Sequence, residues 1–126
     1  MNDKRLFIAV SDVEAVQKAK GRNSRLLISG SETGNKAFAL GRSLMEPGVI
    51  ADLHSHANEE EAMYFYAGEG VCVVGDQKYE IGPETVVLAP AGVKHQVSNT
   101  GTEPLKFVWT MNPPLAAHYS QETYHR

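Results

Sequence analysis

The sequence predicts an all-β fold, either a closed barrel or a sandwich of two sheets. Beyond residue 24, short runs of alternating apolar and polar residues follow one another at even spacing. Such alternation is typical of strands with one buried face. Turn-forming residues, above all glycine and proline, separate the runs. Only one segment carries a helix signal, so the pattern favours antiparallel strands over alternating strand–helix units.

The N-terminal part is predicted to contain the single helix. Arg5–Val10 is strand-like, and the next four residues, Ser11-Asp12-Val13-Glu14, match a capping box, in which glutamate follows a polar cap by three residues. The predicted helix spans Ser11–Lys20 and ends at Gly21. Val13 and Val16 would share one side of this helix, so we expect it to pack on the outside of the β-structure.

The predicted strands form a core at about residues 25–112. Gly75-Asp76 is typical of a tight hairpin turn, and Pro113-Pro114 ends the last strand. The tail, residues 113–126, is polar enough to fray or to wrap a partner subunit. The expected strands are Arg25–Ser29, Ala37–Met45, Ala51–His56, Ala62–Tyr66, Gly70–Val74, Lys78–Ile81, Thr85–Ala89, Lys94–Asn99 and Leu105–Met111.

Length and composition bound the class of protein. The 126 residues suit one globular domain, residues 1–126. A formal net charge of −3 leaves no basic surface for nucleic acid or an anionic membrane. Leu6–Val10 is too short for a signal-peptide core or a membrane span, so we expect a cytoplasmic protein. The single cysteine, Cys72, rules out an intrachain disulfide and is expected to be an unreactive core thiol.

Three histidines and a glutamate suggest a metal site. His54 and His56 lie two residues apart on a predicted strand, so their side chains point to the same face, roughly 7 Å apart at the backbone. A carboxylate from the next strand and His95 from a distant one can converge on that face. Glu61 shares strand parity with the apolar residues that follow it, and Glu60 is the alternative carboxylate.

The spacing of these residues resembles the two motifs of the cupin superfamily, in its small single-domain, cupin 2 type. The first motif is represented by Gly48, His54-x-His56, Glu61 and Gly68, and the second by Pro90-x-Gly92, His95 and Asn99. The chain departs from the second motif at one position, where Glu84 replaces the usual opening glycine. We expect Glu84 to reshape the adjacent loop and to be solvent-exposed.

The resemblance implies a double-stranded β-helix, or jelly roll, that holds one metal ion through His54, His56, Glu61 and His95. Such a donor set suits a divalent Fe, Mn, Ni, Co, Cu or Zn ion and disfavours Ca or Mg. Four protein ligands leave one or two positions open for substrate or dioxygen on an octahedral ion. On a tetrahedral ion, such as zinc, they could close the site.

Strand parity nominates residues for a pocket beside the metal. Phe107, Trp109 and Met111 share one face of the last strand, and Met63 shares a face with Glu61. These side chains form either the wall of a small-molecule pocket or an aromatic core or dimer contact. Arg42 alternates with Phe38, Leu40 and Leu44. If that face points inward, Arg42 would bind a substrate carboxylate; otherwise it is a surface residue. Tyr64 and Tyr66 should face outward or into a sheet-on-sheet contact, and Asn99 should pin a loop.

Two functions are compatible with these features. The first is a metal-dependent enzyme that acts on a small organic acid, sugar acid or phenolic compound. Its chemistry would be Lewis-acid chemistry of the isomerase, lyase or decarboxylase type, or that of an iron-dependent dioxygenase. The alternative is a non-catalytic, metal-dependent barrel that binds or senses a small molecule. No catalytic base is assigned. The resemblance also implies a homodimer, with Arg5–Val10 and the tail from Leu115 at the interface.

Overall fold

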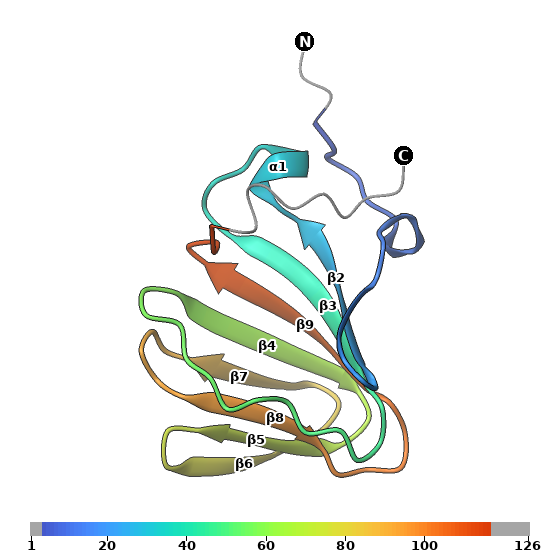
Figure 1. Ribbon diagram of the computed structural model, residues 1–126, viewed down its shortest axis with the longest axis vertical. Coiled ribbons are helices and arrows are strands. Elements are labelled where there is room, and N and C mark those ends of the chain that lie inside the picture. The colour runs from blue at the N-terminus through green and yellow to red at the C-terminus, as the bar shows by residue number, and fades with distance from the viewer. Residues whose placement is uncertain (1–3, 117–126) are drawn as a thin grey trace.

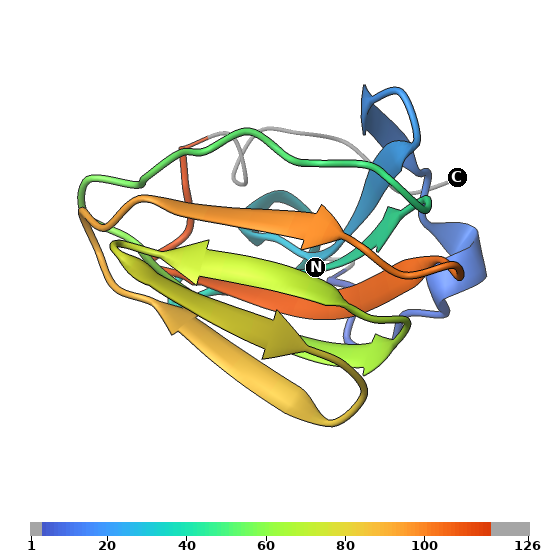
Figure 2. The same ribbon diagram turned by 90° about the horizontal axis from the view of Figure 1, so that it is seen from below.

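The protein consists of two antiparallel β-sheets that face each other, as seen in a computed structural model that describes residues 4–116 (Figures 1 and 2). The larger sheet has the strand order β1-β2-β3-β9-β4-β7, and the smaller has β6-β5-β8. The strands are β1 (Val16–Ala19), β2 (Arg22–Ile28), β3 (Ala39–Met45), β4 (Glu60–Ala67), β5 (Gly70–Val74), β6 (Gln77–Ile81), β7 (Thr85–Ala89), β8 (His95–Asn99) and β9 (Leu105–Asn112). The all-β fold expected from the sequence is thus confirmed.

The hydrophobic core lies between the sheets and follows from the alternation of buried and exposed residues along the strands. Phe65 on β4 and Phe107 on β9 meet there at a ring-centroid distance of 4.9 Å. Cys72 on β5 is fully buried in the same core, and burial raises the pKa of its thiol to about 11. The expected position of this thiol in the core is therefore confirmed. Tyr64 and Tyr66 face outward, as predicted.

On β3, the sequence left open which of the two faces points inward, and the structure buries the set that does not contain Arg42. The small residues Ala39, Gly41 and Ser43 point into the core with Met45, whereas Arg42 and its alternating neighbours are only partly buried. The reason is the Trp109 side chain on the neighbouring β9, which lies over Gly41. A Cβ atom on Gly41 would lie 2.2 Å from Cζ2 of that indole. Position 41 on the inner face of β3 therefore requires glycine.

The predicted helix over Ser11–Lys20 is also wrong. A single 3-10 turn, η1 (Val10–Asp12), is followed by β1, which pairs with β2. Gly21, with φ of 77°, belongs to the hairpin turn between these strands and does not end a helix. A helix in this segment would have buried little more than Val13 and Val16, whereas the hairpin gives β2 a hydrogen-bonded neighbour. Val13 does pack on the outside of the larger sheet, against Leu27 and Leu40.

The N-terminal part also lacks the predicted strand at Arg5–Val10 and contains a short helix that was not predicted. Residues 5–9 form no strand, although the backbone N–H of Arg5 donates to the Glu32 carbonyl at 3.2 Å. Glu32 belongs to the only α-helix among residues 4–116, the single turn α1 (Gly30–Thr33). In this part of the chain, no helix is long and apolar enough to cross a membrane.

The segment predicted as the strand Ala51–His56 runs beside β8 but pairs with it irregularly (Figures 1 and 2). The N–H of Ala51 donates to the carbonyl of Val97 at 2.9 Å, and His54 pairs with His95 in an isolated bridge. Three residue steps on this segment thus match two on β8. The extra residue breaks the ladder, as in a β-bulge, so no continuous strand forms.

Asn99, at the end of β8, pins the loops at this edge as predicted. Its Nδ2 donates to the carbonyls of Met45 and Glu103, both at 2.9 Å. Its Oδ1 accepts the backbone N–H of Gly101 at 2.9 Å. The side chain is 2 % exposed, and both its donors and its acceptor oxygen are used inside the protein.

Glu84 occupies the turn between β6 and β7 in the left-handed region, with φ of 65°. It follows Pro83, and its exposed side chain agrees with the sequence expectation. Its N–H donates to the carbonyl of Phe65 at 2.8 Å, which fixes the turn against β4. A residue with a Cβ atom is strained in this conformation, and that explains why glycine is favoured at such a position.

We therefore predict that Glu84→Gly stabilises the protein. Relief of left-handed strain outweighs the extra entropy of an unfolded glycine, for a net gain of about 0.5–1 kcal/mol in the free energy of unfolding. Urea unfolding followed by circular dichroism measures the change. Glu84→Ala is the control, since it removes the charge but keeps the Cβ atom and should bring no gain. A glycine variant less stable than the alanine variant would contradict the prediction.

Candidate metal centre

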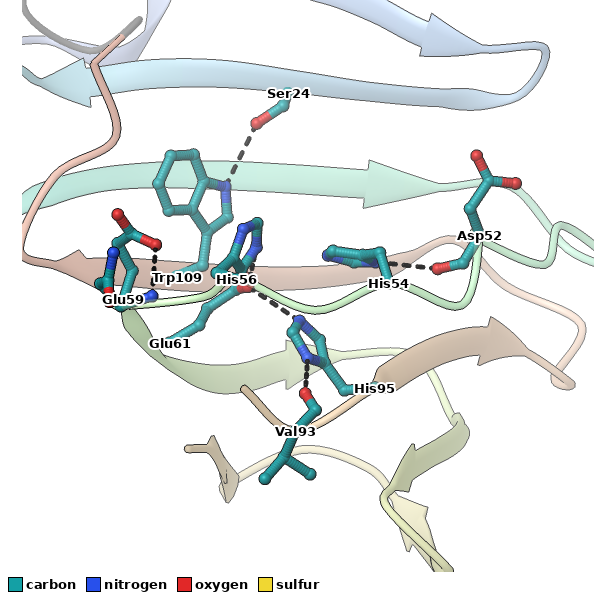
Figure 3. A network of polar contacts seen from close by, with 10 residues as sticks. Ser24, Asp52, His54, His56, Glu59, Glu61, Val93, His95 and Trp109 are labelled. Atoms are coloured by element: carbon teal, nitrogen blue, oxygen red, sulfur yellow. Dashed lines mark hydrogen bonds and ion pairs between the residues drawn. The ribbon is translucent and has the colours of Figure 1, made fainter. Parts of the chain in front are cut away.

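Four side chains from three parts of the chain converge at one end of the space between the sheets (Figure 3). His54 and His56 come from the irregular segment before β4, Glu61 from the start of β4, and His95 from the start of β8. Each offers one ligand atom, and these atoms all lie within 4.8 Å of one another. Glu60 is exposed and lies outside the cluster.

Backbone hydrogen bonds hold the histidine-bearing segments together. His54 and His95 exchange both of their backbone bonds, at 3.1 Å and 2.8 Å. The N–H of Gly92 donates to the carbonyl of His56 at 2.7 Å, which ties the Pro90-x-Gly92 turn to the same segment. On the larger sheet, Glu61 is fixed between Ala89 and Met111 by strand pairing. The positions of the four side chains are therefore set by backbone hydrogen bonds and strand pairing.

Two of the imidazole rings are oriented by backbone carbonyls. Nδ1 of His54 lies 2.9 Å from the carbonyl oxygen of Asp52, and Nδ1 of His95 lies 3.1 Å from that of Val93. When Nδ1–H donates to a carbonyl, the Nε2 lone pair is left for a metal. Nε2 of His95 points at Oε1 of Glu61, 3.1 Å away. This arrangement of rings and carbonyls is typical of metal-ligating histidines.

The third ring, that of His56, has a buried nitrogen without a hydrogen-bond partner. Its Nε2 lies 3.5 Å from Oε1 of Glu61, too far for a hydrogen bond. Burial lowers the pKa of His56, and the Glu61 carboxylate opposes this only in part. For His95, burial also lowers the pKa, but hydrogen bonds to Glu61 and Val93 outweigh it and raise the pKa.

These observations test whether the residues fit a metal ion. Neutral imidazoles and a carboxylate are the donors that divalent transition metals prefer, and an unpartnered buried nitrogen is costly unless something binds it. The proton that Glu61 attracts toward His95 would leave when a metal enters, because ligation requires a neutral imidazole. The cluster thus fits a divalent transition metal ion.

A cavity of about 190 Å³ opens beside the cluster. Of the residues predicted to line a pocket, Met63, Phe107, Trp109 and Met111 do so. Arg42 does not: it lies on the outer face of β3, where Nη1 donates to Oη of Tyr66 at 3.3 Å. The remaining apolar lining comes from Met45, Ala51, Val97 and Leu115.

The polar lining outside the metal cluster, which consists of Lys18, Arg22, Ser24 and Ser43, was not predicted from the sequence. Nε1 of Trp109 donates to Oγ of Ser24 at 3.2 Å, and Oγ of Ser43 donates to the same atom at 3.3 Å (Figure 3 shows the first of these bonds). The prediction of a helix up to Lys20 concealed the hairpin that carries the two cations. Strand parity from Arg22 to Ser24 would have indicated a shared face.

Comparison with known proteins identifies the family to which the chain is similar. The model of the cupin domain family matches residues 41–111. Protein MJ1618 of Methanocaldococcus jannaschii, which is uncharacterized, is 29% identical over 78 residues, or 62% of this chain and 62% of its own. The gentisate 1,2-dioxygenase of a Ralstonia species is 27% identical over 127 residues, covering 97% of this chain but 35% of the enzyme. The chain therefore spans less than two thirds of either relative.

Among solved structures, a predicted oxalate decarboxylase from Thermotoga maritima superposes with a TM-score of 0.75. The two sequences are 26% identical, and the match covers 86% of this chain and 99% of the other.

We predict that Glu61→Ala lowers metal affinity by at least tenfold, on the order of the loss expected when a metal-supporting group is removed. Glu60→Ala is the matched control: the same residue type, one position away, on the exposed side of the strand. Elemental analysis by mass spectrometry, with chelator competition for the affinity, measures both. Equal loss of metal in the two variants, or loss in Glu60→Ala alone, would overturn the assignment of Glu61.

Proposed function

The chain belongs to the cupin domain family, and from that we propose that it is a metal-dependent enzyme acting on a small organic acid. The observation that carries this proposal is the convergence of His54, His56, Glu61 and His95 at the wall of a cavity. We propose these four residues as the ligands of one divalent transition metal ion. Met63, Phe107, Trp109 and Met111 are proposed as the apolar walls that hold the substrate.

Cavity size and charge support an acid as substrate. The volume of about 190 Å³ is below the range of about 300–1,000 Å³ that suits drug-sized ligands, so the substrate is small. Lys18 and Arg22 line the cavity, whereas the one carboxylate among its described lining residues, Glu61, is in the cluster. The names gentisate dioxygenase and oxalate decarboxylase denote enzymes of small carboxylates. Sugar acids and phenolic acids fall within the same chemical class.

The protein's own residues supply binding and orientation in this proposal. A bound divalent ion would act as a Lewis acid that polarises a carbonyl or carboxylate oxygen of the substrate. The His54 and His95 rings, fixed by the carbonyls of Asp52 and Val93, keep their free nitrogens directed at one point. The apolar walls lower the local dielectric constant and so strengthen electrostatic contacts inside the cavity. With iron, the same arrangement would suit a dioxygenase.

One observation favours the second candidate function, a non-catalytic barrel that binds or senses a small molecule. Apart from the four proposed ligands, the titratable side chains that line the cavity in the described part of the chain are the cations Lys18 and Arg22. No further carboxylate or imidazole stands ready there as a general base. An enzyme built this way depends on the metal for its acid–base or redox chemistry, and a binding protein needs no base at all.

We predict that the protein, loaded separately with iron, manganese, nickel, cobalt, copper or zinc, consumes at least one acid from a panel of small carboxylates. Proton NMR of the mixtures, with and without dioxygen, measures consumption. The His54→Ala/His56→Ala double variant is the control and should be inactive, because it lacks two of the proposed ligands. Binding by thermal shift without any turnover would support the sensing barrel, and metal-free, folded protein would contradict both functions.

We also propose that the protein is a homodimer. Leu6 and Phe7, within the segment expected at the interface, are each 87% exposed, which is unusual for large apolar residues in a monomer. The tail that was expected to join them lies mostly outside the described residues. We predict a dimer by light scattering at micromolar concentration and a monomer for Leu6→Ser/Phe7→Ser. A monomeric wild-type protein would refute the proposal.

A further inference from the structure

Arg22, at the start of β2, brings a charged side chain to the cavity. It is partly buried and lines the cavity, yet its side chain forms no hydrogen bond or ion pair with any described residue. Lys18, on β1, lines the cavity beside it. A half-buried guanidinium that faces a cavity and lacks a carboxylate is suited to bind an anionic ligand group, which it can contact with two parallel hydrogen bonds.

Ser24 lies two residues further on the same strand, and therefore on the same face. It is 7% exposed. Its Oγ accepts hydrogen bonds from Nε1 of Trp109 and from Oγ of Ser43. A hydroxyl oxygen has two lone pairs, and both are occupied by these bonds. The Ser24 O–H is left as a donor, and the residue lines the same cavity as Arg22.

Arg22 and the metal cluster lie toward different ends of one segment. The hairpin that carries Arg22 touches Val49: a Cβ atom on Gly21 would lie 2.7 Å from its Cγ2. The same segment continues through Ala51, which lines the cavity, to His54 in the cluster. Five residues of extended chain span at most about 17 Å, and the arginine side chain shortens the gap. A short carbon skeleton can thus bridge the two ends.

We propose that Arg22 and Ser24 form an anion-binding subsite at the end of the cavity away from the metal cluster, with Lys18 adding positive charge. The substrate class that follows is a small molecule with two acidic groups, one for the metal centre and one for Arg22. This inference rests on the proposed function, because it assumes that a first acidic group binds at the cluster. It assigns the specificity for the second group to Arg22.

The test compares diacids with monoacids of equal carbon number: malonate with propionate, succinate with butyrate, and glutarate with valerate. Calorimetry on the cobalt-loaded protein gives the affinity for each acid, and the visible spectrum of cobalt reports whether an acid reaches the metal. We expect at least one diacid to bind about tenfold or more tightly than its matched monoacid, as a charge-assisted contact provides.

The variants separate the subsite from general effects of charge. In Arg22→Ala, the diacid should bind no better than its monoacid, whose own affinity should stay unchanged. Arg22→Lys should restore part of the preference, and Ser24→Ala should weaken the diacid about threefold. Arg25→Ala is the matched control, since it removes the same charge from the same strand. Its side chain donates to the carbonyl of Val10 at 2.8 Å and does not line the cavity.

The outcomes distinguish this inference from the proposed function. Equal affinity for every diacid and its monoacid, or a diacid preference that survives in Arg22→Ala, overturns the subsite even when the cobalt spectrum responds to acids. A diacid preference that depends on Arg22 supports the subsite. If the cobalt spectrum then stays unchanged, the metal role in the proposed function fails instead. Should Arg22→Ala not fold, Arg22→Gln takes its place.

Discussion

The site depends on the paired backbone bonds between His54 and His95. The segment before β4 has no continuous ladder to hold it, and this bridge fastens it to the smaller sheet at the point where the imidazoles are needed. The larger sheet contributes Glu61 from the opposite side. Without the bridge, the two histidines of the segment would lie on a loop, and the carboxylate would face a single imidazole.

The cluster also contains a buried polar atom that has no hydrogen-bond partner. Glu61 stands beside two imidazoles, and these respond in opposite directions: the pKa of His56 is lowered by burial, and that of His95 is raised by its hydrogen bonds. Since Nε2 of His56 has no hydrogen-bond partner, the fold retains a group whose burial is unfavourable. Such groups persist where function requires them, which is why the cluster rather than the aromatic wall directs the functional proposal.

Much of the fold could be predicted from the sequence, because alternation and turn residues are local signals. The grouping of His54, His56 and His95 could likewise be predicted, because it required only strand parity and the glycine and proline residues of the two motifs. The orientation of β3 could not be predicted, since alternation defines two faces but does not say which one is buried. That choice depends on an indole from β9, far away in the chain. At Ser11–Lys20, a capping-box pattern matched a helix locally, but pairing with β2 decided the structure.

The contact between Gly41 and Trp109 makes the substitutions that each position tolerates depend on the other. The indole occupies the space that a Cβ atom at position 41 would need, and from there it reaches the hydroxyl of Ser24. A larger residue at position 41 is tolerated only after the indole has become smaller, and a smaller side chain at position 109 leaves a hole over the glycine. The two positions are therefore epistatic, and a viable mutational path has to change position 109 first.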